Sequence, residues 1–124
     1  VPMKIIICGA GVVGTGIARQ LVLEDHDVVV VDNDPIMIGR LNETLDVTGI
    51  VGYASHPGVL QNCGAKDADM LIAVTQVDEV NMVACQIAHT LFNIPTTIAR
   101  IRDQNYLLPE WRSLYRHDRL PIDY

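Results

Sequence analysis

At 124 residues the chain has the size of one ordinary domain, so a single fold must account for the whole sequence. Hydrophobic residues make up 49% of it and aromatic residues only 5%, a composition typical of packed strands and helices that argues against disorder. The net charge of -6 argues against a nucleic-acid-binding surface, which needs basic patches to neutralise phosphate. Without a long apolar run or a leader, we expect a soluble, intracellular protein.

The first half of the chain predicts three strands. Residues 4–8 and 28–31 are short β-branched runs, typical of strands buried on both faces of a parallel sheet, and residues 48–51 predict a third strand. Helical spacing predicts a helix that follows the first strand and runs to about Glu24, and Pro35 suits the first turn of the next helix. The apolar residues of these two helices are Val13, Ile17, Ala18, Leu21, Val22, Met37, Leu41 and Leu45.

The second half predicts two more strands, at residues 70–74 and 97–101. A brief helix from Ser55-His56-Pro57 to Gly64 precedes them, and residues 107–114 predict the core of a last helix. Between the two strands lies the clearest amphipathic helix in the sequence. Its apolar face consists of Val80, Val83, Ala84, Ile87, Ala88 and Leu91.

Strands that alternate with helices through short connections predict a parallel sheet, because parallel neighbours need right-handed crossovers. We therefore predict the α/β fold class, as a Rossmann-type doubly wound parallel sheet with helices on both faces. The expected strand order is 3-2-1-4-5, and this fold has room for a sixth strand. No internal repeat or boundary is visible, so residues 3–124 are predicted to be one domain.

A glycine-rich turn joins the first strand to the first helix. Its sequence, Gly9-Ala10-Gly11-Val12-Val13-Gly14, is the G-x-G-x-x-G fingerprint in the strand–turn–helix context that dinucleotide binding needs. The first glycine permits the tight turn, the second lets backbone approach a pyrophosphate, and the third lets the helix pack on the strand. Free N–H groups at Ala10 to Val13, at the positive end of the helix dipole, are expected to bind the phosphates.

A carboxylate follows the second strand. Asp32 lies about 20 residues after the fingerprint, where dinucleotide-binding domains place the acid that hydrogen-bonds ribose hydroxyls. It would repel a 2′-phosphate, and Asn33-Asp34-Pro35 offers no arginine to receive one, so NAD is favoured over NADP. Asp32 and Asn33 are therefore predicted contacts. The alternative is a glycine turn and a strand-end acid that bind no ligand.

Further candidates lie at the carboxyl ends of the other strands, where sheets wound this way bind ligands. Thr75 and Gln76 are expected to hydrogen-bond the second ribose or a phosphate, and Arg100 is expected to neutralise phosphate charge. Ser55 and His56 fit a helix cap better than a ligand contact.

Other polar residues have simpler explanations. Asp78 and Glu79 favour the N-terminus of the next helix through its dipole. Cys8, Cys63 and Cys85 are scattered, so we expect buried thiols rather than disulfides, metal ligands or a nucleophile. The four histidines lack metal-ligand spacing, and no metal site is predicted.

Several segments resemble one family: residues 3–11, 31–32, 52–57, 67–75, 78–79, 81–82 and 98–102. The Gly-x-Ala-Ser-His-Pro and Ala-Arg-Ile-Arg stretches among them are not generic features of a dinucleotide-binding fold. The chain resembles the N-terminal domain of the cytoplasmic regulatory subunit of Trk-type bacterial potassium uptake systems, the TrkA, KTN or RCK N-terminal family.

This resemblance implies a sensor that binds NAD or NADH, or ATP, ADP or AMP at the same site, and that gates a membrane potassium-transport subunit. It also implies homo-oligomers, as dimers or rings, at the cytoplasmic inner face of the plasma membrane, and an N-terminal fragment of a longer chain. Carried over by position, the ligand contacts fall on Gly9 to Val13, Asp32, Thr75, Gln76 and Arg100.

Two functions are weighed: a nucleotide-sensing regulator of potassium transport and an NAD-dependent oxidoreductase. A dehydrogenase usually places its acid or base on another domain, and no proton donor stands out here, so we expect no enzymatic activity. The last predicted helix carries more apolar surface than a terminal helix needs, so it either forms a subunit interface or covers its own sheet. Its residues in question are Leu107, Leu108, Trp111, Leu114 and Tyr115.

Overall fold

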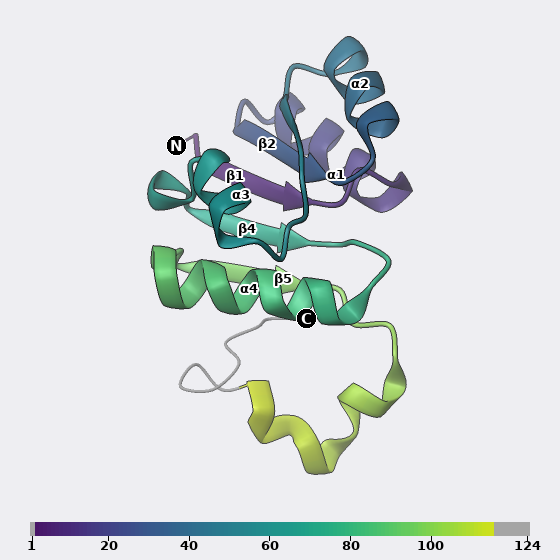
Figure 1. Ribbon diagram of the computed structural model, residues 1–124, viewed down its shortest axis with the longest axis vertical. Coiled ribbons are helices and arrows are strands. Elements are labelled where there is room, and N and C mark those ends of the chain that lie inside the picture. The colour runs from purple at the N-terminus through teal and green to yellow at the C-terminus, as the bar shows by residue number, and fades with distance from the viewer. Residues whose placement is uncertain (1, 116–124) are drawn as a thin grey trace.

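The computed structural model describes residues 2–115, in which a parallel sheet lies between two layers of helices (Figure 1). The strands are β1 (Lys4–Cys8), β2 (Asp27–Asp32), β3 (Thr48–Val51), β4 (Met70–Ala73) and β5 (Thr96–Ala99). The α-helices are α1 (Val12–Leu23), α2 (Pro35–Thr44), α3 (Pro57–Asn62) and α4 (Asp78–Phe92).

The sheet has the order β3-β2-β1-β4-β5, and all neighbouring strands are parallel. Ile6 of β1, for example, lies between Val29 of β2 and Leu71 of β4. The predicted fold class and strand order are therefore confirmed, and residues 2–115 contain no sixth strand. The strand order reverses between β1 and β4, which makes this point the topological switch of the sheet.

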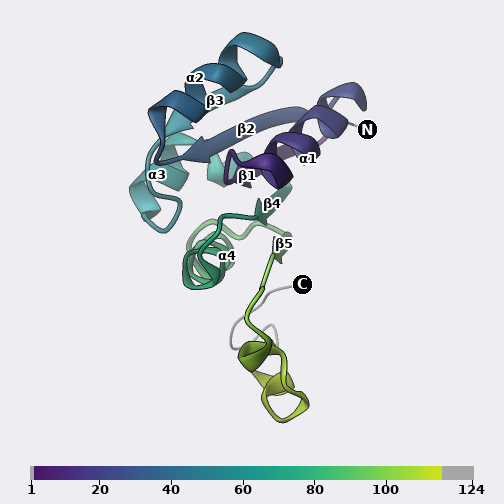
Figure 2. The ribbon, with the colours of Figure 1, turned by 90° about the vertical axis from the view of Figure 1, so that its right-hand side faces the viewer.

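Alternate residues of the central strand face two separate cores. Ile5 and Ile7 face α1 and α2, whereas Ile6 and Cys8 face α3 and α4, and all four are fully buried (Figure 2). A strand covered on both sides must be apolar throughout, because successive side chains point to opposite faces. This explains the continuous apolar run of residues 4–8 and confirms helices on both faces.

The three cysteines are buried thiols without a disulfide, as predicted. Burial raises the pKa of Cys63 to about 11 and that of Cys8 well above its usual range. Because the thiolate is the reactive form, burial favours the less reactive protonated form of both thiols.

The helix predicted over residues 107–114 is confirmed only in part, because it is not a continuous α-helix. The chain instead forms two 3₁₀ turns, Gln104–Leu107 and Pro109–Tyr115, and the intervening Leu108 has extended backbone with φ -61° and ψ 141°. Proline disfavours the α conformation of the residue before it, so Pro109 interrupts the helix. We call residues 104–115 the 3₁₀ segment.

The 3₁₀ segment extends away from the sheet and contains no buried residue (Figure 2). Tyr106, Leu107 and Tyr115 are partly buried against the core, but Leu108 and Trp111 are 40% and 54% exposed. The segment therefore leaves much of its apolar surface uncovered, and a subunit interface there stays a prediction.

The remaining differences between the predicted and the observed helices and strands are small. The buried face of α4 is narrower than predicted, because Val83 and Leu91 are 43% and 58% exposed. β4 and β5 end before Val74 and Arg100, which places both residues in loops at the carboxyl edge of the sheet. Among the described helices, none has both the length and the apolar character to cross a membrane.

Candidate functional site

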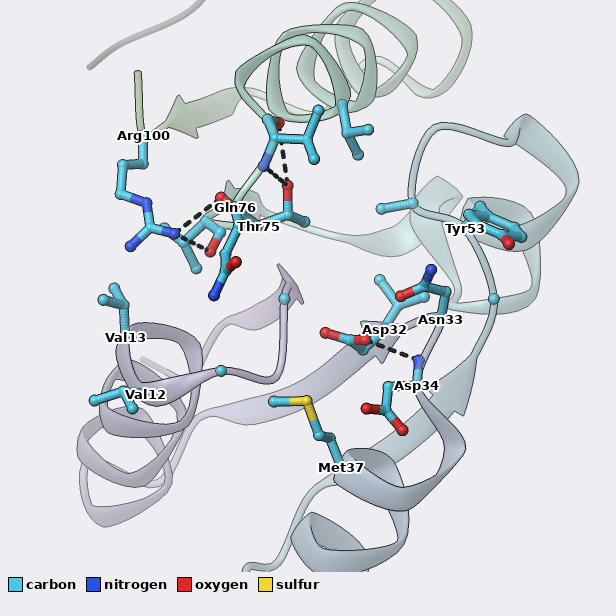
Figure 3. A pocket seen from close by; sticks show the side chains of 18 of the residues that line it. Val12, Val13, Asp32, Asn33, Asp34, Met37, Tyr53, Thr75, Gln76 and Arg100 are labelled. Atoms are coloured by element: carbon cyan, nitrogen blue, oxygen red, sulfur yellow. Dashed lines mark hydrogen bonds between the residues drawn. The ribbon is translucent and has the colours of Figure 1, made fainter. Parts of the chain in front are cut away.

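A cleft of about 660 Å³ opens at the carboxyl edge of the sheet, beside the topological switch (Figure 3). Ligand sites in proteins have volumes of about 300–1,000 Å³, so the cleft has room for a nucleotide. Nine of the eleven predicted contacts line it: Gly9, Gly11, Val12, Val13, Asp32, Asn33, Thr75, Gln76 and Arg100. Ala10 and Gly14 do not line it.

The geometry of the turn agrees with the roles predicted for Gly9 and Gly14, and the approach of a pyrophosphate to Gly11 stays a prediction. Gly9 has a φ of +114°, a backbone conformation that strains any residue with a Cβ atom. A Cβ atom at Gly14 would lie 1.8 Å from the carbonyl oxygen of Gly9, so Gly14 serves the packing of α1 against the turn. A Cβ atom at Gly11 would meet nothing within 4 Å, so the backbone there is open to a ligand.

The Asp32 carboxylate is held by backbone groups of two loops. Its Oδ2 accepts a hydrogen bond from Ala10 N at 2.8 Å, and its Oδ1 accepts one from Asp34 N at 2.9 Å. The prediction of a free N–H group at Ala10 is therefore wrong, because the carboxylate occupies it. A carboxylate has about four acceptor positions, so Asp32 keeps acceptor capacity for hydroxyl groups in the cleft.

The N-terminus of α1 forms the adjoining wall of the cleft. Gly11 is the N-cap residue, and no side chain caps the helix. The first N–H groups of a helix have no partner within the helix, so those of Val12 and Val13 are available to an anion. The Val12 side chain is 93% exposed and leaves the approach unobstructed.

The side chain of Asn81, on α4, hydrogen-bonds two residues of the cleft, Thr75 after β4 and Arg100 after β5. Its Oδ1 accepts hydrogen bonds from Thr75 N at 2.9 Å and the Thr75 hydroxyl at 2.7 Å. Its Nδ2 donates to Thr75 O at 3.1 Å and Arg100 O at 2.9 Å. Asn81 is fully buried. Sequence reasoning missed it, although an asparagine between Val80 and Met82 in an amphipathic helix is a detectable signal.

Arg100 lies across the carbonyl end of β4. Its Nη2 donates to Val74 O and Thr75 O, each at 2.9 Å, while Nε is buried without a partner in the described chain. A guanidinium has five N–H donors, so donors remain for an anion in the cleft. Its contact with phosphate stays a prediction.

The capping role predicted for Ser55 and His56 does not hold for their side chains. His56 is the N-cap residue of α3 but makes no side-chain capping bond. Its ring instead packs against Tyr53, with 5.2 Å between ring centroids. Tyr53 lines the cleft and is 57% exposed.

Asp78 was predicted to favour the helix dipole, and its side chain also binds the backbone that follows β5. It is nearly buried at 8% exposure, and its carboxylate accepts hydrogen bonds from the N–H groups of Arg102 and Asp103. Glu79, its neighbour, accepts one from the Tyr106 hydroxyl at 2.5 Å.

The cleft differs chemically from one end to the other. The Asp32 and Asp34 side chains lie at the β2 end, and the Arg100 side chain lies at the β5 end (Figure 3). Arg102 also lines the cleft. Sequence reasoning also missed an apolar wall of the cleft, formed by Met37 of α2, Val80 of α4 and Val77, the N-cap residue of α4. The arrangement suits a ligand with hydroxyl groups, a flat apolar ring and phosphates. The described residues contain no His, Cys, Asp and Glu cluster that fits a metal ion.

The TrkA-N domain family matches residues 5–116. The chain belongs to the TrkA-N domain family. This confirms the resemblance inferred from the sequence.

Curated relatives of this TrkA-N domain are Trk system potassium uptake proteins TrkA. Those of Azorhizobium caulinodans and Halomonas elongata are 59% and 51% identical to it over 121 residues, or 98% of the chain. The chain spans 26% of the length of each. These relatives are named as uptake proteins and not as enzymes.

Solved structures share the fold. The TrkA-N domain of the inner membrane protein ybaL from Escherichia coli superposes with a TM-score of 0.76 at 20% identity, covering 85% of this chain and 77% of that one. The GsuK channel bound to NAD gives a TM-score of 0.74 at 22% identity over 86% of this chain and 19% of that one. The AMP-bound Kef CTD of Shewanella denitrificans gives 0.71 at 23% identity over 89% and 69%.

Proposed function

We propose that this TrkA-N domain binds NAD or NADH in the cleft and thereby regulates a membrane potassium-transport subunit. The observation that carries the proposal is Asp32, whose carboxylate is oriented by two backbone N–H groups beside the uncapped N-terminus of α1. Ribose hydroxyls would donate to Asp32, and the pyrophosphate would accept hydrogen bonds from Val12 N and Val13 N.

The ligand class follows from charge. Asp32 and Asp34 together repel a 2′-phosphate, which supports NAD over NADP. AMP, ADP and ATP share the adenosine half and fit the same contacts. The NAD-bound GsuK channel and the AMP-bound Kef CTD support nucleotide binding by this fold.

The cleft supports sensing rather than catalysis. At the β4 and β5 end, where the second half of a dinucleotide would lie, the polar side chains are Thr75, Gln76, Arg100 and Arg102. This set contains none of the histidine, carboxylate, lysine, tyrosine or cysteine side chains that usually act as general acids and bases, which supports sensing. A regulator needs only that the ligand bind one of two states more tightly.

The relatives' names support potassium uptake as the regulated process. We propose that the domain acts as a homo-oligomer, as a dimer or a larger ring, at the cytoplasmic inner face of the plasma membrane. The binding of a transport subunit there would couple nucleotide occupancy to transport.

Calorimetry with NAD, NADH, NADP, AMP, ADP and ATP tests the ligand site. We expect NAD to bind, NADP to bind more weakly, and Asp32→Ala to weaken NAD binding by about tenfold or more, the effect of losing charge-assisted hydrogen bonds. Asp46→Ala, at an exposed acid outside the cleft, is the matched control and should leave binding unchanged. Equal affinities of the two variants would contradict the ribose contact, and enzyme-dependent NADH oxidation with carbonyl substrates would favour the oxidoreductase.

A further inference from the structure

The chain that leaves β5 is fastened to the first turn of α4. The Asp78 carboxylate accepts hydrogen bonds from Arg102 N at 2.9 Å and Asp103 N at 2.8 Å. Both carboxylate oxygens are used, and the side chain is only 8% exposed. Hydrogen bonds to a charged acceptor are stronger than neutral ones, so this pair fixes the direction in which the chain leaves the sheet.

The same residues adjoin the cleft. Arg102 lines it, as do Val77 and Val80, the neighbours of Asp78 along the start of α4. Asn81 ties Arg100 O to Thr75 one turn further along the helix. A phosphate that binds Arg100 and Arg102 in the cleft would therefore act on the backbone that Asp78 holds.

A series of hydrogen bonds also connects Asp78 and its neighbour Glu79 to the 3₁₀ segment. Asp103 Oδ1 accepts from Asn105 N at 2.9 Å, and Tyr115 donates to Tyr106 O at 2.8 Å. Glu79, next to Asp78, accepts from the Tyr106 hydroxyl. No residue of the segment is fully buried, so these hydrogen bonds add to the partial burial of Tyr106, Leu107 and Tyr115 in holding it in place.

We propose that Asp78 is a positioning residue that couples occupancy of the cleft to the position of the 3₁₀ segment. This inference rests on the proposed nucleotide site. A small shift of residues 100–103 becomes a larger displacement of the segment, because the segment extends beyond its attachment and has few core contacts (Figure 2). Its exposed Leu108, Trp111 and Leu114 would change position with the ligand.

Trp111 is the single tryptophan of the chain, so its emission reports on the 3₁₀ segment. NAD titrated into the protein should change this emission with the same midpoint as calorimetric binding, and should change the hydrogen exchange of Arg102 N and Asp103 N. In Asp78→Asn, we expect NAD affinity to stay within about threefold while the emission change is lost and exchange of these amides quickens by about tenfold. Asp46→Asn, the same charge change at an exposed position, should behave as the unmodified chain.

The outcomes separate the two proposals. Absence of NAD binding to the unmodified chain would overturn the proposed function and this inference with it. NAD binding with no change in emission or in exchange of the two amides would overturn the inference alone, and this arm needs no variant. Should Asp78→Asn fail to fold, Tyr106→Phe removes an exposed hydrogen bond of the same series and should reduce the emission change. An unaltered change in that variant, or in folded Asp78→Asn, would overturn the inference.

Discussion

Replacement of Asn81 by alanine tests whether one buried side chain joins the two strand ends that line the cleft. Asn81→Ala removes four hydrogen bonds, but two of the four groups that lose Asn81 have a second partner. The Thr75 hydroxyl also reaches Val77 O, and Thr75 O also accepts from the Arg100 guanidinium. Thr75 N and Arg100 O lose the partner that Asn81 supplies. An unsatisfied polar group costs about 1–3 kcal/mol, so Asn81→Ala should destabilise the fold by about 2–6 kcal/mol, toward the lower end where water reaches the cleft.

Urea and thermal denaturation measure this loss. The urea midpoint should fall at an unchanged slope, and Tm should fall by about 8 °C or more, since 1 kcal/mol corresponds to about 4 °C in a domain of this size. Asn62→Ala, at an exposed position ending α3, is the control and should shift Tm by less than about 2 °C. Equal Tm values for the two variants would refute the reasoning, because the four hydrogen bonds would then contribute nothing to stability.

The glycine turn, a buried thiol and an exposed phenol provide three more tests. Gly14→Ala should prevent stable folding, because its Cβ atom would lie 1.8 Å from a backbone oxygen of the turn. A Cβ atom at Gly16, in the same helix, would meet nothing within 4 Å, so Gly16→Ala should raise the stability of the fold by up to about 1 kcal/mol. Circular dichroism during heating measures both effects. Cys63, with its pKa raised to about 11 by burial, should resist alkylation at neutral pH and react as the pH approaches that value, followed by mass spectrometry of its peptide. The hydrogen bond to Glu79 raises the pKa of Tyr106, so Glu79→Gln should lower the pH at which that phenol ionises, measured by ultraviolet absorbance against Tyr106→Phe.

Each test has a result that would count against its argument. Normal folding of the alanine variant at Gly14 would mean that α1 and the turn are not in the contact described. Rapid alkylation of Cys63 in the folded protein at neutral pH would mean that the thiol is exposed. An unchanged titration of Tyr106 after Glu79→Gln would mean that the two side chains do not interact.

The sequence was sufficient to predict a structural feature where the physical rule behind that feature acts over a short stretch of chain. Buried parallel strands need continuous apolar runs, so residues 4–8 and 28–31 identified the centre of the sheet. The glycine spacing and Asp32 identified the cleft, because turn, helix N-terminus and strand-end acid are all local features. The break in the predicted last helix is also a local feature, since Pro109 marks it in the sequence itself.

Only the tertiary structure decided how residues distant in the sequence share partners. Ala10 N appeared free for phosphate until folding brought the Asp32 carboxylate to it, and Asp78 appeared to serve a helix dipole until β5 brought Arg102 N within reach. Asn81 was not predicted to have a role in the site, yet its side chain hydrogen-bonds the residues that follow β4 and β5. Helix and strand propensities and residue spacing depend on neighbours along the chain, so they can be recognised in a single sequence. The hydrogen-bond partners of buried polar groups depend on which loops the sheet places side by side, so only the tertiary structure shows them.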